Sequence, residues 1–149
     1  MASSSYNDVR AVIESRVDAE MNDGPIYPVS FQNIPFTPPD DTPWVAVNIR
    51  FGNNNYATLL GPNPGFNRQV GTVVLDVYTP KGVGAGENYT IAERLKDLFD
   101  RQNISGIIFD AASGPADVVP PAPSDTRSRS VEEAYFRTQT TITFQAYLE

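Results

Sequence analysis

Gln69-Val70-Gly71-Thr72-Val73-Val74-Leu75-Asp76-Val77-Tyr78-Thr79 is typical of a strand, and this stretch decides the fold together with the glycines and the helix after it. Val73, Leu75 and Val77 alternate with their neighbours, so they share one face of a sheet. Gly82-Val83-Gly84-Ala85-Gly86 then ends the alternation and leads into a helix expected over residues 88–102. The apolar stripe of this helix consists of Ile91, Leu95, Leu98 and Phe99, and its outward side carries Glu93, Lys96, Asp97 and Asp100.

Another amphipathic helix is expected near the N-terminus, from Ser5 to Met21. Ser5 and Asp8 have the spacing of a capping box in its acidic variant, in which each side chain accepts a hydrogen bond from the other residue's backbone. Asn22-Asp23-Gly24-Pro25 ends the helix, because glycine and proline favour a stop there. The apolar stripe consists of Val9, Val12, Ile13, Val17 and Met21.

Alternating apolar residues predict further strands, over residues 26–31, 44–51, 56–60, 107–109, 116–119 and 131–148. Pro28 cannot donate to a sheet ladder, so the first of them belongs at an edge or at a strand start. Gly52-Asn53-Asn54-Asn55 is expected to form a turn. The last strand is long against the usual five or six residues, and we expect part of it to extend beyond the subunit's own core.

These elements define the fold class. Two amphipathic helices can cover only one face of such a sheet. The sequence therefore predicts an α+β fold: a mixed, mostly antiparallel sheet with two amphipathic helices packed on one face. The length of 149 residues predicts a single domain over residues 1–149. Residues 120–130, rich in Pro, Ser, Arg and Asp, are interpreted as a mobile internal loop, because a strong strand comes after them.

Composition excludes several classes of function. The sequence contains no cysteine and no histidine, which removes disulfides, Cys/His zinc sites and Ser-His or Cys-His catalytic pairs. The formal net charge of −7 argues against stable DNA binding, since binders neutralise phosphates with Lys and Arg. No apolar run approaches the roughly 18 residues of a membrane span. Met1-Ala2-Ser3-Ser4-Ser5 lacks the features of a signal peptide, so we expect the product to stay in the cytoplasm where it is made.

The glycine-rich segment 82–86 lies between a strand and a helix, where a dinucleotide-binding fingerprint would lie. The fingerprint needs G-x-G-x-x-G, and Glu87 stands at its third glycine position. A carboxylate at a helix start would repel a pyrophosphate. The phosphate-binding P-loop pattern fails as well, because Lys81 precedes the glycines instead of following them. A connecting loop is the better interpretation.

Other polar features are weaker candidates for chemistry. Asp40-Asp41 suggests a metal or acid/base pair, but adjacent carboxylates in a loop usually point apart into water. Arg127 and Arg129, near Asp125, form a mixed-charge segment that is either solvated or in contact with a partner or a phosphate. Trp44 is expected to anchor the core or a loop rather than to stack on a ligand. Glycosylation-like triplets begin at Asn88 and Asn103, without a signal peptide to deliver them. We assign no catalytic, cofactor-binding or metal-binding residue.

Three segments carry a family resemblance. The first runs from Phe31-Gln32-Asn33-Ile34-Pro35-Phe36-Thr37-Pro38-Pro39 to Pro43-Trp44-Val45. The second runs from Arg68-Gln69-Val70-Gly71 to Val77-Tyr78-Thr79-Pro80-Lys81-Gly82-Val83-Gly84. The third is Ile91-Ala92-Glu93-Arg94-Leu95-Lys96-Asp97-Leu98-Phe99. In this order they resemble the tail terminator-like proteins of long-tailed bacteriophages.

The resemblance implies a structural virion protein with no catalytic residues and no cofactor. It implies a homo-hexameric ring at the head-proximal end of the tail, assembled in the host cytoplasm. The ring stops polymerisation of the tail tube and offers a surface to the neck or head-completion protein. Its partners would be other copies of itself, the tail tube protein and the neck protein. DNA would pass through the lumen without stable binding, and no membrane is involved.

Two other classes of function stay open on the sequence alone. One is a phage or host adaptor that recognises a protein or glycan through Trp44 and the aromatic-Pro loops. The other is a small hydrolase that works through carboxylates alone. Solution mass separates the ring from the adaptor, because a ring has about six times the mass of the subunit.

Overall fold

The computed structural model describes residues 5–24, 26–39, 41–56, 67–82, 84–118 and 135–148. Within them the chain forms two helices and a sheet of seven strands, which confirms the α+β class. The elements are α1 (Tyr6–Met21), β1 (Val29–Ser30), β2 (Trp44–Tyr56), β3 (Asn67–Pro80), α2 (Gly86–Phe99), β4 (Asn103–Ile104), β5 (Ile107–Phe109), β6 (Ser113–Val118) and β7 (Tyr135–Leu148).

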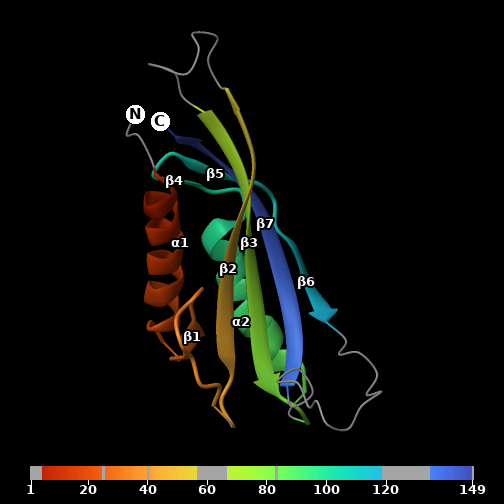
Figure 1. Ribbon diagram of the computed structural model, residues 1–149. Coiled ribbons are helices and arrows are strands. Elements are labelled where there is room, and N and C mark those ends of the chain that lie inside the picture. The colour runs from red at the N-terminus through yellow and green to blue at the C-terminus, as the bar shows by residue number, and fades with distance from the viewer. Residues whose placement is uncertain are drawn as a thin grey trace, which may run out of the picture.

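The sheet is mixed and mostly antiparallel, as predicted, with the order β1-β2-β3-β7-β5-β4. β2, β3 and β7 are long antiparallel neighbours that run side by side along the molecule (Figure 1). β1 pairs with β2 in parallel at the edge of the sheet. β5 and β6 share the other side of β7, β5 opposite Phe144 and Gln145 and β6 opposite residues 137–141.

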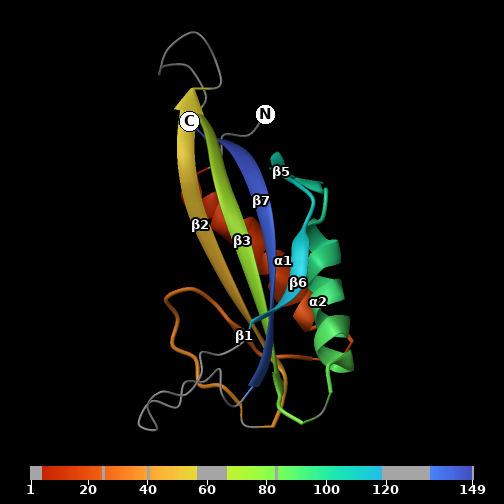
Figure 2. The same cartoon turned by 90° about the vertical axis from the view of Figure 1, so that its right-hand side faces the viewer.

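Both helices pack on the same face of the sheet, as expected (Figure 2). The alternation of each strand points one set of apolar side chains at them. The predicted inward residues of β3, Val73, Leu75 and Val77, are among the buried residues of this core. The helices contribute Val9, Ile13, Val17 and Met21 from α1 and Ile91, Ala92, Leu95 and Phe99 from α2.

The helix ends are set by local chemistry. Ser5 caps α1 through the predicted box, its Oγ accepting from the Asp8 N–H while the Asp8 carboxylate accepts from the Ser5 N–H. α2 ends at Phe99, not at 102, because the chain turns there into the β4–β5 hairpin. Arg101 has a φ of 55°, and its N–H donates to the Asp110 carbonyl across that hairpin.

The expected turn at residues 52–55 is wrong, because β2 continues through them to Tyr56. A bulge between Phe51 and Asn54 accommodates the polar run. The buried side chain of Gln69 holds the bulge: its Nε2 donates to the Gly52 carbonyl at 2.8 Å and its Oε1 accepts from Asn54 Nδ2 at 3.0 Å. Residues 57–60 of the strand expected at 56–60 lie outside the described residues.

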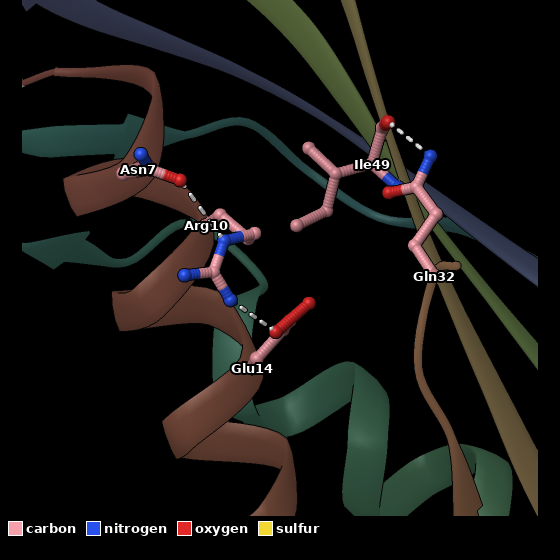
Figure 3. A network of polar contacts seen from close by, with 5 residues as sticks. All are labelled: Asn7, Arg10, Glu14, Gln32 and Ile49. Carbon is pink, nitrogen blue, oxygen red and sulfur yellow. Dashed lines mark hydrogen bonds and ion pairs between the residues drawn. The ribbon is translucent and has the colours of Figure 1, made fainter. Parts of the chain in front are cut away.

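The edge strand predicted over residues 26–31 is reduced to Val29 and Ser30. Beyond it a side chain takes the place of a strand, because the Gln32 amide lies against Ile49 of β2 (Figure 3). Gln32 Nε2 donates to the Ile49 carbonyl and Gln32 Oε1 accepts from the Ile49 N–H, both at 3.2 Å. The Gln32 amide thus pairs with both backbone groups of an edge residue.

The final strand is described from Tyr135 to Leu148. Alternate residues from Thr138 to Leu148 are all buried on the helix side, so this part lies within the subunit's own core. Residues 131–134 of the strand expected over 131–148 lie outside the described residues, so the expected extension beyond the core stays a prediction. The short buried strand at 107–109 is confirmed as β5, and the strand expected at 116–119 begins earlier, at Ser113. The segment 120–130, predicted to be mobile, lies outside the described residues.

Candidate functional site

An aromatic cluster occupies the helix-free face of the sheet where β2 begins. Trp44 is only 6% exposed and stacks on Tyr78, with ring centroids 4.0 Å apart and planes at 3°. Tyr135 meets Trp44 edge-on, and its hydroxyl donates to the Pro39 carbonyl. Phe36 packs on Trp44, with the two ring centroids 5.1 Å apart. The cluster therefore fixes the Pro-rich segment to the sheet, which agrees with the anchoring role expected for Trp44. Tyr78 covers the ring face of Trp44 on which it stacks.

A buried charge pair lies next to this cluster. Asp76 of β3 is 3% exposed, and its Oδ1 accepts from Arg137 Nε and Gln139 Nε2 of β7, each at 3.2 Å. Burial raises the pKa of Asp76 above its ordinary value, while Arg137, Gln139 and Arg50 oppose the shift. The Arg137 guanidinium also lies over the Tyr78 ring. The sequence pattern did not reveal this pair, although a lone aspartate within a β-branched run was its signal.

The glycine-rich loop ends beside a pocket. Gly82 and Gly84 adopt positive φ angles of 89° and 85°, which glycine tolerates best. The pocket has a volume of about 420 Å³ and is lined by Pro80, Lys81, Gly82, Gly84, Ala85, Val118, Tyr135, Phe136 and Arg137. Glu87 is exposed in the first turn of α2, where a phosphate would have to bind. Glu87 thus occupies the place of the third glycine of the dinucleotide fingerprint, and a connecting loop stays the better interpretation of residues 82–86.

Asn88 is a structural residue that the sequence pattern did not reveal. It is fully buried, and its Nδ2 lies 3.0 Å from the Val77 carbonyl and 3.2 Å from the Phe136 carbonyl. Its Oδ1 accepts from the Thr138 hydroxyl at 2.5 Å. One amide therefore joins the start of α2 to both central strands. Its place on the buried stripe, three residues before Ile91, was the available signal.

Of the remaining candidates, Asp41 lies within the described residues. Asp41 is exposed, and its Oδ1 accepts from the Thr42 hydroxyl at 3.3 Å. Asp40, Asp125, Arg127 and Arg129 lie outside the described residues. Within the part of the chain that the structure describes, no group of three or more Asp, Glu, His or Cys side chains is placed to hold a metal ion. No helix in that part is long and apolar enough to cross a membrane.

Comparison with known proteins identifies the family. A family model described as "Phage tail terminator protein" matches residues 8–106, from α1 to the turn after β4. The chain belongs to the phage tail terminator family. This is a family of structural phage tail proteins, and its match contains all three segments on which the resemblance rests. A search of curated proteins found no match.

The fold of this tail terminator family member is shared with a solved structure. That structure aligns with a TM-score of 0.64 and 21% sequence identity, covering 95% of this chain and 94% of the other. At this identity the likeness shows the fold alone. The shared fold covers 95% of the chain, so it reaches beyond the residues 8–106 of the family match.

Proposed function

We propose that the protein closes the head-proximal end of the phage tail tube as a homo-oligomeric ring of six copies, as the resemblance to its family implies. The family match over residues 8–106 is the observation that carries this proposal. In this role the ring stops polymerisation of the tube and provides the surface that joins the neck or head. The protein acts by assembly and performs no catalysis.

The form of the subunit suits such a ring. A closed ring needs a heterologous interface, in which one patch of a subunit meets a different patch of its neighbour. Among the described residues, α1 and α2 cover one face of the sheet and no helix covers the other, so the two sides of the subunit differ. The long pairs β2–β3 and β3–β7 form a rigid support for both surfaces.

The proposed partners are the tail tube protein on one rim and the neck or head-completion protein on the other. DNA passes through the lumen without stable binding, in keeping with the net charge of −7. The adaptor alternative relied on Trp44 and the aromatic-Pro loops as a binding surface. The burial of Trp44 against Tyr78 argues against Trp44 as a ligand platform, so the ring is the function we propose.

The ring can be tested with purified protein and tail tubes. We expect light scattering to give about six times the subunit mass, either free or after addition of tubes, and negative-stain images to show capped tube ends. Tubes without the protein are the control and should continue to lengthen. A strict monomer that never caps a tube would contradict the proposal.

A further inference from the structure

The helix-free face of β2, β3 and β7 differs in charge from the rest of the molecule. Its outward positions alternate with the buried ones along each strand. In the described strands the charged outward residues are Arg50, Arg68, Asp76 and Arg137. Three cations and one anion give this face a charge of +2, whereas the whole chain carries −7.

Two of these arginines are available to a partner. Arg137 forms an ion pair with Asp76, and the Arg137 side chain is only 17% exposed. Arg50 and Arg68 are exposed, and neither forms a hydrogen bond or ion pair with another described residue. Arg50 lies opposite Thr72 in the sheet, and Thr72 lies opposite Thr143. The Arg50 charge also acts on the Asp76 carboxylate, although the two side chains form no ion pair. We call Arg50, Arg68, Thr72 and Thr143 the basic sheet face.

The outer side of the helix layer carries the opposite charge. Tyr89, Glu93 and Asp97 follow at intervals of four residues, so they form one exposed stripe of α2. Glu93 and Asp97 have no hydrogen-bonding or ion-pair partner within the described residues. Tyr89 is 42% exposed, and its hydroxyl donates a hydrogen bond of 3.2 Å to the Asp117 carboxylate of β6. We call Tyr89, Glu93, Asp97 and Asp117 the acidic flank.

We propose that the basic sheet face of one subunit docks on the acidic flank of the next, with Arg50 and Arg68 facing Glu93 and Asp97. This inference rests on the proposed ring. The two patches lie on opposite sides of the sheet, so each subunit uses both, and the contact is heterologous. A two-fold dimer through either patch would bring like charges together, which disfavours it. The exposed Tyr89 ring gives the acidic flank an apolar and hydrogen-bonding centre.

Charge reversal tests the docking. Two double variants are needed, Arg50→Glu with Arg68→Glu and Glu93→Arg with Asp97→Arg. Each variant alone places like charges in every interface, and we expect its assembly affinity to fall at least ten-fold. An equimolar mixture should recover the ring, because the two variants can then alternate around it. Each interface joins either two reversed patches or two unreversed patches, and in both cases the charges are opposite. The matched control, Lys81→Glu with Arg101→Glu, changes the charge equally at two other exposed cations and should leave assembly intact.

Light scattering provides the measurement, on tail tubes if the ring forms only there, and circular dichroism verifies folding. Should a reversed variant fail to fold, the neutral pair Arg50→Gln and Arg68→Gln replaces it. That variant should assemble more weakly than wild type and with a smaller dependence on salt, because salt screens the contact it lacks.

The outcomes separate this inference from the ring itself. A wild-type ring whose two reversed variants both still assemble would overturn the docking and leave the ring proposal standing. Loss of assembly without recovery in the mixture would overturn the pairing of these two patches. If the basic-face variant keeps the ring mass but loses affinity for duplex DNA, the face contacts DNA in the lumen and the docking is wrong. A wild-type monomer that never caps a tube would instead contradict the proposed function.

Discussion

At the scale of single residues, Asn88 is a buried polar side chain on which we expect stability to depend. Asn88→Ala removes one amide that bonds the Val77 carbonyl, the Phe136 carbonyl and the Thr138 hydroxyl, all in a buried region. Buried groups left without partners make the substitution costly, and we expect a loss of about 2–3 kcal/mol in the free energy of unfolding. Asn103→Ala, at an exposed asparagine, should change it by less than about 0.5 kcal/mol. Equal denaturant midpoints for the two variants would disprove the role of Asn88.

Asp76 gives stability a dependence on pH. Burial raises its folded-state pKa above the ordinary value of 3.8, so the folded protein holds this proton more tightly than the unfolded chain does. The resulting stabilisation is complete below 3.8 and is lost as pH rises through the folded-state pKa. Asp76→Asn keeps an oxygen for Arg137 and Gln139 but does not titrate.

Urea unfolding of both proteins over a series of pH values tests this. Wild type should lose stability relative to Asp76→Asn as pH rises above 3.8, because all other carboxyl groups are common to the two proteins. A difference between the two that stays constant with pH would show that burial does not perturb Asp76.

Core residues were predictable from the sequence, whereas the polar residues that organise the core were not. Val73, Leu75 and Val77 follow from a period of two, which is a local property of the chain. Thr138, which bonds Asn88, and Arg137, which bonds Asp76, lie on β7, 50 and 61 residues further along the chain. A sequence pattern shows that such a residue is unusual for its position but does not show which strand it meets.

At the scale of elements, α2 holds the sheet through one apolar face. Leu95 and Phe99 are fully buried in the common core, whereas Asp97 is exposed. Leu95→Asp or Phe99→Asp places a carboxylate in the core at a cost of several kcal/mol, a large share of a small domain's stability. We expect both variants to unfold, while Asp97→Ala keeps the wild-type melting temperature. Thermal melts followed by circular dichroism decide this, and wild-type melts for the Leu95 or Phe99 variant would show that the helix face is misassigned.

The order and class of the elements were predicted correctly. The predicted ends of strands were wrong where a side chain from elsewhere in the chain, rather than a strand backbone, bonds to the sheet. Gly52-Asn53-Asn54-Asn55 has turn composition, yet Gln69 satisfies its carbonyl groups and keeps it in β2 as a bulge. Likewise the Gln32 amide replaces the edge strand next to Ile49. In both places a glutamine side chain bonds to β2 from a distant part of the sequence. Such tertiary contacts are not contained in residue propensities.

At the scale of the whole molecule, the sequence predicted the family, but not the surfaces through which it acts. The aromatic-Pro segment and the glycine-rich loop are local motifs, and the structure uses them as an anchor on Trp44 and a connection into α2. The separation of charge between the two sides of the sheet depends on which residues of different strands face outward together. It becomes visible only once the register of β2, β3 and β7 is known.

A structural role for the whole molecule predicts that its loop carboxylates are dispensable. Asp40→Asn with Asp41→Asn, or Glu87→Gln, should leave tail termination intact, scored as tail length and infectious particles. These carboxylates were the best candidates for a metal or catalytic site. Asp41 and Glu87 are exposed, and among the described residues neither belongs to a group of three or more side chains that could hold a metal ion. Neutralising an exposed charge should alter stability by only about 0.5 kcal/mol per site. None of the three belongs to the basic sheet face or the acidic flank, so assembly should be unchanged as well. Lost termination with normal folding and normal ring mass would indicate chemistry or ion binding at these loops, and the non-catalytic function would have to be withdrawn.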